Sequence, residues 1–469
     1  MKSGGDDFST VSFFKPEIGK MSDGQETQPD APGLTTKETP PPFAPVSAAE
    51  RVNSVDVLRG FALLGILGMN IYAFALPWVA YNNPLSYGAT TGVHFGTWVF
   101  THLFFDLKFM TIFSMLFGAG LVLMSRRAES VGRKFGGIYY RRMLWLLVFG
   151  AIHGYLLWFG DILFSYAVCG LLLYPLRRRS PRLLIALGAI SLLLGMGISA
   201  GGGFFFDQAR RQAIEADSTI AAGGTPTELQ MDMKKTWEGV RDAFAPNPEK
   251  IAEEVDAFRG GYADNVRYRA PIVAMMQTQA MIFMMFWRIA GAMLLGMGLM
   301  KLGVFSAQRT RKFYLLSMLF GYGLGLPLIV VGLKLNLAHD FDFVYGMKLN
   351  THFNYVGSIL VALGHAGAVM LACKSGLFAG LRRRLAAVGQ TALTNYLGHT
   401  LLMTPIFYGF GLGLFGRLDR FWLMFFVLGV WILQLIISPI WLKYFRFGPF
   451  EWVWRTLTYW KRQPMRATV

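Results

Sequence analysis

RRRSPRLLIALGAISLLLGMGISAG, the stretch at residues 177–201, places four arginines in front of nineteen residues without a charge. About 20 apolar residues in a helix span the hydrocarbon core of a bilayer, which is about 30 Å thick. Lys and Arg next to such a helix stay on the cytoplasmic side. The stretch therefore predicts a membrane-spanning helix over 183–201 whose first residues lie at the cytoplasmic face.

The same pattern recurs along the chain, which is 54% hydrophobic and only 16% charged. Soluble domains carry about 25% charged residues. Ten apolar segments are predicted to span the membrane: 57–78, 97–124, 143–159, 161–176, 183–201, 274–300, 314–333, 353–373, 386–411 and 421–441. Backbone groups in lipid must be satisfied internally, and the segments lack the period of two that is typical of a barrel. The predicted fold class is all-α, a polytopic membrane protein with about ten transmembrane helices.

The net charge of +17 indicates the orientation of these helices. Lys and Arg collect in every second gap, such as 125–142 and 301–313, whereas the gap 79–96 contains neither. Ten spans with both termini in the cytoplasm place all the basic gaps inside. The charge is thus explained by topology, so we expect the lipid bilayer as a partner and no nucleic acid.

The remaining stretches divide the chain further. Residues 1–50 are rich in Gly, Ser, Asp and Pro and predict a disordered cytoplasmic tail. The gap 202–273 carries twelve acidic and nine basic residues and predicts a helical extracytoplasmic cap. This cap separates two five-helix halves, 51–201 and 274–441. The aromatic and basic stretch 442–469 predicts an interfacial cytoplasmic tail.

Two helix starts are visible in the cap. Thr227 precedes Glu228 in a capping pattern, and Asn247 precedes Pro248, a residue suited to the first helical position. Five spans on each side of the cap give the halves opposite orientations, an arrangement found in inverted-repeat transporters.

Ionisable side chains inside spans are costly and are functional candidates. Arg288 lies near the middle of 274–300, where it either serves function, pairs with a carboxylate or extends toward the membrane surface. Asp106 and Lys108 lie within 97–124. If that segment consists of two pieces, both residues are expected at a bend near the surface.

His153 and Asn70 are predicted at similar depths in the outer half of the membrane. His153 lies twelve residues after Arg141, and Asn70 lies eleven after Arg59. Asp161 follows at the outer hairpin. A histidine beside a carboxylate is suited to general-base chemistry. The alternatives are that Asp161 caps the next helix and that His153 only bridges helices.

Other polar residues carry weaker signals. Thr391, Asn395 and His399 share one helix face, which either lines a cavity or joins two helices, and we favour the second. Cys169 and Cys373 both lie in apolar segments, and no metal site is predicted.

Several motifs resemble a known family, the YeiB-like bacterial inner-membrane proteins that contain a domain of unknown function (DUF418). The motifs that carry this resemblance are Asn82-Asn83-Pro84, Lys108-Phe109, Phe113-Ser114-Met115-Leu116-Phe117-Gly118, His153-Gly154, Gly160-Asp161 and Ala392-Leu393-Thr394-Asn395-Tyr396-Leu397. The resemblance covers about residues 51 to 460. It implies that the chain lies in the bacterial inner (cytoplasmic) membrane.

A more distant resemblance concerns chemistry. Arg51-x-x-Ser54-x-Asp56-x-x-Arg59-Gly60, followed by Asn70, is similar to the opening of transmembrane acyltransferases such as heparan-alpha-glucosaminide N-acetyltransferase. This implies transfer from cytoplasmic acyl-CoA, most simply acetyl-CoA, to a small-molecule or glycan acceptor on the far side. Those enzymes place a histidine soon after the asparagine, where this chain has Tyr81-Asn82-Asn83-Pro84.

The sequence thus predicts a membrane acyltransferase. Arg51, Asp56, Arg59 and Arg288 are predicted to bind acyl-CoA, and no metal is required. Asn70 is predicted to support the thioester carbonyl, and His153, oriented by Asp161, is predicted to be the base. The alternatives are a small-molecule transporter or exporter and a non-catalytic scaffold, and a homodimer is left open.

Overall fold

The computed structural model describes residues 52–132 and 134–467. The predicted tail 1–50 and Arg51 lie outside the described residues. Within the described ranges the chain is helical, with one isolated β-bridge between Phe445 and Arg466. The α-helices are α1 (Asn53–Ala75), α2 (Val79–Asn82), α3 (Gly92–Phe104), α4 (Lys108–Ser130), α5 (Gly136–Ile152), α6 (Leu163–Leu173), α7 (Pro181–Ala221), α8 (Glu228–Phe244), α9 (Pro248–Arg259), α10 (Tyr262–Gln277), α11 (Phe286–Lys301), α12 (Arg311–Ala338), α13 (Phe343–Tyr345), α14 (Thr351–Ser375), α15 (Ala379–Gln390), α16 (Ala392–Phe407), α17 (Arg420–Tyr444) and α18 (Pro449–Tyr459). Three π-helices, η1 (His153–Leu157), η3 (Met281–Met285) and η4 (Gly346–Asn350), and a 3₁₀-helix, η2 (Tyr174–Arg178), complete the set.

Seven helical stretches in the described ranges are long and apolar enough to cross a membrane. They are Asn53–Ala75, Gly92–Ser130, Pro181–Ala221, Met281–Lys301, Arg311–Ala338, Phe343–Ser375 and Arg420–Tyr444. The all-α, polytopic fold class is therefore confirmed. The other three predicted spans correspond to α5, α6 and α16, whose α-helices have 17, 11 and 16 residues, so the total of ten stays a prediction.

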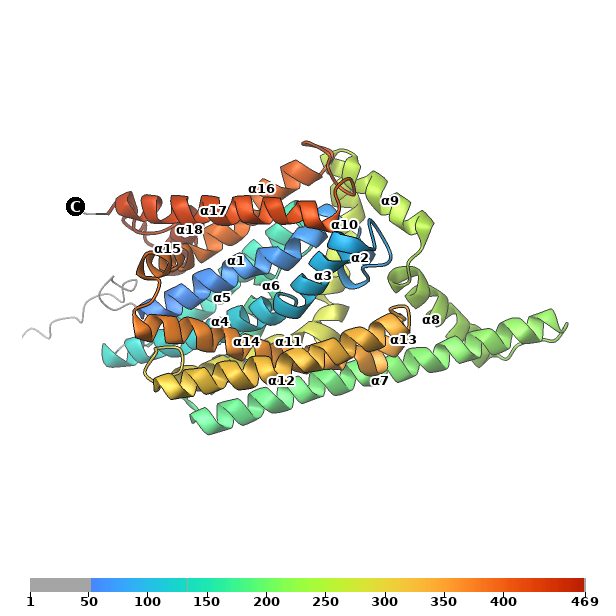
Figure 1. The fold of residues 1–469 in the computed structure, drawn as a ribbon, viewed down its shortest axis with the longest axis horizontal. Helices are drawn as coiled ribbons and strands as arrows, with labels where there is room; N and C mark the ends of the chain where they lie inside the picture. The colour runs from blue at the N-terminus through green and yellow to red at the C-terminus, as the bar shows by residue number, and fades with distance from the viewer. Residues whose placement is uncertain (1–51, 133, 468–469) are drawn as a thin grey trace, which may run out of the picture. The chain divides into compact units, whose positions relative to one another are not determined.

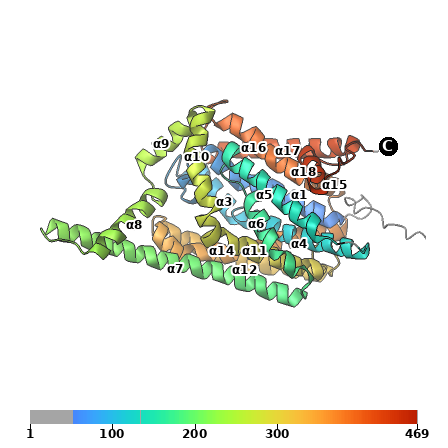
Figure 2. The same ribbon diagram turned by 180° about the vertical axis from the view of Figure 1, so that it is seen from behind.

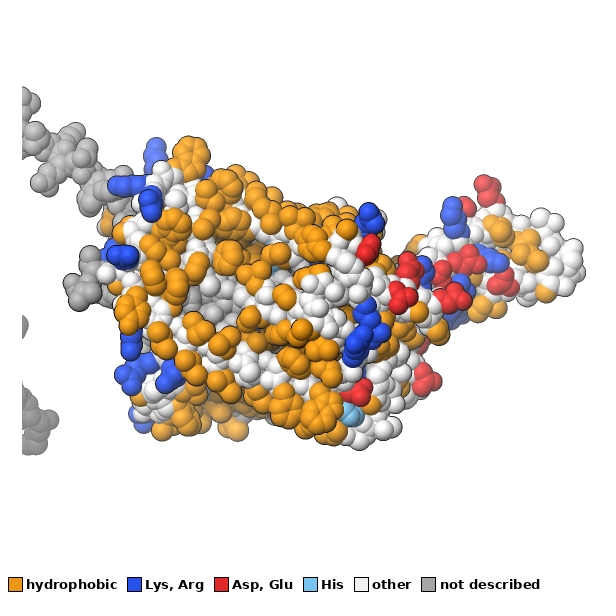
Figure 3. All heavy atoms as spheres, turned by 90° about the horizontal axis from the view of Figure 1, so that it is seen from above, with side chains coloured by type: hydrophobic (Ala, Val, Ile, Leu, Met, Phe, Trp, Pro, Cys, Tyr) orange, Lys and Arg blue, Asp and Glu red, His pale blue; other side chains and the backbone are white. Residues whose placement is uncertain are grey.

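The helices pack side by side in a bundle, which Figures 1 and 2 show from opposite sides. Lys and Arg gather at one end, which we call the basic end, where α1, α7 and α12 begin and α17 ends (Figure 3). The opposite end, which carries α8 to α10, is called the cap end. Acidic and basic side chains are mixed there.

Glycines bring pairs of helices into backbone contact. A Cβ on Gly296 of α11 would lie 1.9 Å from the Met115 carbonyl of α4, and one on Gly118 would lie 2.0 Å from the Met293 carbonyl. Small residues permit this close approach in membrane helices. The same holds between α1 and α15, where a Cβ on Gly389 would lie 2.0 Å from the Asp56 carbonyl.

The predicted helix starts in the cap are confirmed. The Thr227 side chain accepts a hydrogen bond from Gln230 N at the start of α8, and the Asn247 side chain accepts from Glu249 N at the start of α9. α7 does not end at residue 201 but continues to Ala221, and its 41 residues span about 60 Å. α8 packs along the part of α7 that extends past the bundle (Figure 1).

α9 is docked onto the bundle by polar contacts as well as by its apolar face. Glu254 Oε1 accepts a hydrogen bond of 2.9 Å from the backbone N–H of Trp78, which follows α1. Arg259 Nε donates to the Phe415 carbonyl over 2.8 Å. Val255 and Phe258 are buried beside these contacts.

The segment predicted over 97–124 consists of two helices, α3 and α4. The chain breaks at residues 105–107, where Leu107 adopts a φ of 62°. Both side chains lie inside the bundle, because Lys108 is fully buried and Asp106 is 9% exposed, and the position of the bend relative to the membrane surface stays a prediction. The first turn of α4 thus begins inside the bundle.

Candidate functional site

His153 lies at the junction of α5 and η1 with a hydrogen-bond partner on each ring nitrogen. Nδ1 lies 2.8 Å from Oδ1 of Asp161, and Nε2 lies 2.9 Å from Oγ1 of Thr400 on α16. The histidine is 1% exposed, and the Asp161 side chain is 3% exposed. A carboxylate at Nδ1 favours the tautomer with its proton on that nitrogen, which leaves Nε2 able to accept a proton from a hydroxyl group.

Asp161 makes both contacts expected from the sequence, one with His153 and one with the start of the next helix. Its Oδ1 orients His153, and its Oδ2 accepts a hydrogen bond of 2.8 Å from Phe164 N at the start of α6. His153 also bridges helices, because Thr400 belongs to α16. These structural contacts position the imidazole, and they leave its role in chemistry a prediction.

Arg269, which was not predicted from the sequence, caps the end of the π-helix that begins at His153. Arg269 on α10 donates to the carbonyls of Tyr155, Leu156 and Leu157 over 3.0, 2.5 and 2.9 Å. It is fully buried. The last carbonyls of a helix lack partners within it, so Arg269 satisfies them and fixes the segment that carries His153.

Asn70 lies on the part of α1 that approaches this site. Ala73 accepts a hydrogen bond from Trp158, and the Phe74 ring stacks on Trp158 at 4.0 Å, one turn beyond Asn70. The Trp158 ring lies 6.3 Å from that of His153. Asn70 is half-buried, and its side chain makes no hydrogen bond with another described residue. Its amide is therefore available to a ligand.

Asp56 and Arg59 form a pair at the basic end of α1. Arg59 Nη1 donates to Asp56 Oδ1 over 2.8 Å and contacts the Gly389 carbonyl at 3.5 Å. The Arg59 side chain is 27% exposed. Asp56 thus orients the Arg59 side chain, while Arg51 lies outside the described residues.

Arg288 lies apart from that pair, on the other side of α4. Its Nη2 donates to Thr111 Oγ1 over 3.0 Å and to Ser358 Oγ over 2.7 Å, and its Nη1 donates to the Tyr355 carbonyl over 3.2 Å. No carboxylate of the described chain lies within 4.0 Å of its guanidinium, so the carboxylate-pair alternative is wrong for these residues. Phe109 of α4 faces Gly65 of α1, whereas Thr111 faces Arg288.

A second polar cluster surrounds the break between α3 and α4. Lys108 Nζ donates to the His102 carbonyl over 2.5 Å and to Asn354 Oδ1 over 2.9 Å. Asp106 Oδ2 accepts from Asn354 Nδ2 over 2.7 Å and lies 3.2 Å from His102 Nδ1. His102 and Asn354 were missed from the sequence, because a histidine and an asparagine this far apart carry no common spacing signal.

The polar face of α16 joins two helices, as favoured from its spacing. Asn395 Nδ2 donates to Ser438 Oγ on α17 over 3.0 Å, and His399 Nε2 lies 3.2 Å from Gln434 Oε1. Within the described ranges, no group of three or more His, Cys, Asp or Glu residues is placed to hold a metal ion.

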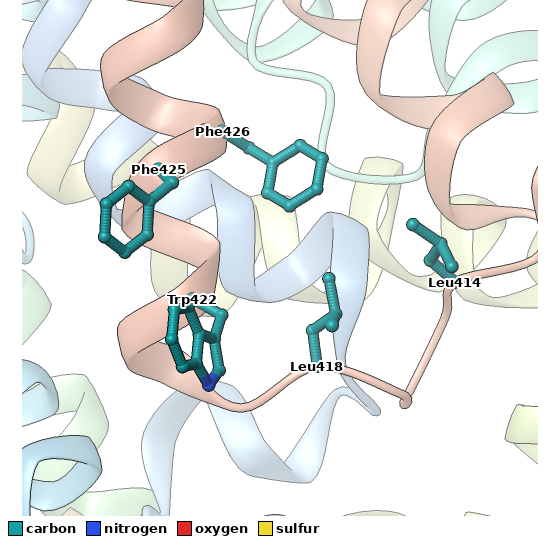
Figure 4. Close-up of a pocket in the computed structure, with 5 residues that line it drawn as sticks. All are labelled: Leu414, Leu418, Trp422, Phe425 and Phe426. Carbon is teal, nitrogen blue, oxygen red and sulfur yellow. The ribbon is translucent and has the colours of Figure 1, made fainter.

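The surface hollows beside α17 are apolar. One, of about 400 Å³, is lined by Leu414, Leu418, Trp422, Phe425 and Phe426, which Figure 4 shows around the start of α17. A second of about 400 Å³ lies between α16 and α17. Neither is lined by Arg59, Asn70, His153 or Arg288. These hollows suit lipid chains and do not connect the predicted site residues.

Comparison with known proteins identifies relatives across the chain. Residues 299–461 match the family described as "Protein of unknown function (DUF418)". The uncharacterized protein YeiB of Escherichia coli (strain K12) is 34% identical over 425 residues, which cover 87% of this chain and 96% of YeiB. The uncharacterized protein YxaH of Bacillus subtilis (strain 168) is 29% identical over 439 residues, 90% of this chain and 97% of YxaH. No solved structure matches the chain.

Proposed function

The chain belongs to the YeiB-like family, and we propose that it is a membrane acyltransferase that moves an acyl group from acyl-CoA to a hydroxyl or amine acceptor. The observation that carries the proposal is the buried line Asp161–His153–Thr400, with contacts of 2.8 and 2.9 Å. It is the arrangement of a general base with an orienting carboxylate.

His153 is the base in this proposal. Thr400 Oγ1 marks a position within reach of Nε2, and the acceptor hydroxyl takes that position when the threonine side chain turns away. Nε2 removes the acceptor proton as the acceptor oxygen attacks the thioester carbonyl carbon. The carbon–sulfur bond then breaks, and the imidazolium returns the proton to the departing CoA thiolate. Asn70 donates its amide to the carbonyl oxygen, where negative charge develops.

A half-buried face of α1 supports a route between the CoA phosphates and this centre. Arg59, Ile66 and Asn70 are spaced by seven and four residues and share one face, while most of α1 is buried. Eleven residues separate Arg59 from Asn70, a rise of about 16 Å. An extended pantetheine arm can bridge such a distance along α1.

In this proposal the protein lies in the inner membrane with both termini in the cytoplasm, and the basic end faces the cytoplasm. The collection of Lys and Arg at that end supports this orientation (Figure 3). Arg59 then meets cytoplasmic acyl-CoA, and His153 serves an acceptor that enters from the cap end. Arg288 lies apart from this route, on the other side of α4, and its ligand-binding role belongs to the transport alternative.

The alternative function is transport of a small molecule, which the break between α3 and α4 favours. Interrupted helices with buried charges form substrate sites near the midplane of secondary transporters. In this case Lys108 and Arg288 contact the transported solute. Lys108 lies on α4, and Arg288 on α11 binds Thr111, one turn further along α4.

Purified protein in lipid nanodiscs tests the two functions. With radiolabelled acetyl-CoA and a panel of sugar and amine acceptors, we expect wild-type protein to form an acylated product and His153→Gln to lose at least 99% of that rate, about 3 kcal/mol. The control is His94→Gln, which changes a half-buried histidine in the first turn of α3, distant in sequence from the site. Wild-type rates in His153→Gln would refute the base. Solute counterflow in liposomes without acylation would favour transport.

A further inference from the structure

We propose that Arg288 and Lys108 form a binding site for a small monovalent anion inside the bundle, beside the break between α3 and α4. The anion is a halide or a short carboxylate, which share one negative charge and the capacity to accept several hydrogen bonds. The site is separate from the proposed acyl-transfer centre and does not depend on it. For the transport alternative, it names the chemical class of the solute.

Hydrogen bonds to α4 and α14 hold the two cations next to each other. Lys108 Nζ donates to Asn354 Oδ1 over 2.9 Å. Arg288 Nη2 donates over 2.7 Å to Ser358 Oγ, which lies one turn after Asn354 on α14. On α4, Lys108 lies one turn before Thr111, which accepts from Arg288 Nη2 over 3.0 Å. The two side chains are close enough for their positive charges to repel each other.

This cluster carries more positive than negative charge. Lys108 is fully buried and Arg288 is 6% exposed, and no carboxylate of the described chain lies within 4.0 Å of either cation. Asp106 reaches Lys108 only through Asn354, whose Nδ2 donates to Asp106 Oδ2 over 2.7 Å. His102, 3.2 Å from Asp106, adds no negative charge in either protonation state. Because an unbalanced charge is costly in a buried place, a bound anion is favoured here.

Two buried donors in this cluster have no partner among the described residues. One is Arg288 Nε, and the other is the hydroxyl group of Tyr355. The Arg288 guanidinium lies 4.5 Å from the centre of the Tyr355 ring, and Arg288 Nη1 donates to the Tyr355 carbonyl over 3.2 Å. Both donors thus belong to one pair of side chains in contact. A buried donor without a partner costs free energy, and an anion that accepts hydrogen bonds from both groups removes this cost.

Close packing against α7 restricts the size of the ligand. A Cβ on Gly195 of α7 would lie 2.9 Å from the Tyr355 hydroxyl oxygen and 2.9 Å from Trp287 Cβ. Ser191, one turn earlier on α7, donates to the Trp287 carbonyl over 2.8 Å. The backbone of α7 therefore covers the Tyr355 hydroxyl group closely. This packing favours an anion the size of chloride or acetate over a nucleotide or a sugar.

Anion binding to purified protein in phosphatidylcholine nanodiscs tests the site. The probes are sodium chloride and sodium acetate, each exchanged against sodium gluconate at constant ionic strength, so that charge screening does not change. We expect chloride, acetate or both to raise the unfolding temperature of the wild type in a saturable way, because a ligand that binds only the folded protein stabilises it. The concentration dependence gives the dissociation constant.

Two substitutions should shift the affinity in opposite directions. Tyr355→Phe removes an unpartnered hydroxyl group, so the ligand-free protein should unfold at the wild-type temperature or above it, while the anion binds about tenfold more weakly. Asp106→Asn removes a negative charge and should strengthen binding by about tenfold or more. Arg288→Gln should abolish binding. The controls are Tyr444→Phe and Lys334→Gln, which change an exposed hydroxyl group and an exposed cation and should match the wild type.

The results for the site are distinguishable from those for either proposed function. If neither chloride nor acetate stabilises the wild type more than gluconate does, the site is refuted and acyl transfer at His153 is unaffected. Equal affinities in the wild type, Tyr355→Phe and Asp106→Asn also refute it. Saturable binding of chloride identifies a halide site and binding of acetate a carboxylate site, and either supports the proposal. If the bound anion shows no counterflow in liposomes, transport is refuted and the binding site stands.

Discussion

Glu254 should make the docking of the cap sensitive to pH. The residue is 7% exposed, and its carboxyl group lies between α9 and the residues that follow α1. Burial raises the pKa of Glu254 from 4.5 to about 7, and the hydrogen bond from Trp78 N opposes this shift only in part. The folded protein therefore holds the proton of Glu254 more tightly than the unfolded chain does.

The direction and size of the effect follow from linkage. The stabilisation is fully present below about pH 4.5, falls as the pH rises and is lost above about pH 7. The difference in pKa corresponds to about 3 kcal/mol. Glu254→Gln keeps the carbonyl acceptor for Trp78 N but carries no charge, so it should match the wild type near pH 5 and be more stable by up to about 3 kcal/mol near pH 8.

The assay is thermal unfolding in nanodiscs of neutral lipid across this pH range, followed by tryptophan fluorescence because Trp78 lies at the contact. Glu253→Gln is the matched control, since the neighbouring Glu253 side chain is 56% exposed and paired with Lys250. Its pH profile should follow that of the wild type. The reasoning is refuted if Glu254→Gln and the wild type lose stability in parallel between about pH 5 and 8.

Three further predictions concern the bundle and the proposed site. Asp161→Asn should lower the rate of acyl transfer by about 10³- to 10⁴-fold, because the amide favours the wrong tautomer of His153. Single-turnover assays with acetyl-CoA measure this rate, and a value within threefold of the wild type contradicts the prediction. Gly296→Ala should destabilise the fold by about 1–3 kcal/mol, because its Cβ would meet the Met115 carbonyl. Gly197→Ala is the control, since the space around Gly197 is open, and thermal unfolding compares the two variants. A double-mutant cycle of Asn395→Ala and Ser438→Ala should give a coupling of about 0.6 kcal/mol, and no coupling would show that their 3.0 Å contact contributes nothing.

Hydropathy and charge predicted the membrane fold because both depend on local sequence. The apolar runs predicted the helices, and the side chains of Thr227 and Asn247 marked where α8 and α9 begin. Hydropathy did not predict where a long helix ends outside the bilayer. α7 continues through three consecutive glycines, Gly201 to Gly203, although glycine disfavours a helix, and it ends just before Gly223, which adopts a φ of 79°.

The pair His153 and Asp161 was predictable because eight residues separate its members across one hairpin. Thr400 was not, since it follows His153 by 247 positions, and only the packing of α16 against η1 brings them together. The same limit hid Asn354 beside Lys108 and Ser358 beside Arg288. Tertiary packing decides these contacts, and a single sequence contains no record of it.

Because α7 is uninterrupted, the height of α8 above the bundle and the direction in which α8 points depend on each other at the cap end. One inserted residue would lift α8 by about 1.5 Å and also swing it by about 100° around the helix axis. α9 stays attached to the bundle through Glu254 and Arg259, so such a swing strains the short connection between α8 and α9. Length changes between residues 202 and 221 should therefore be tolerated in steps of about three to four or seven residues, which restore the heading of the helix face. The length of this part of α7 is therefore restricted to values that differ by whole helical turns.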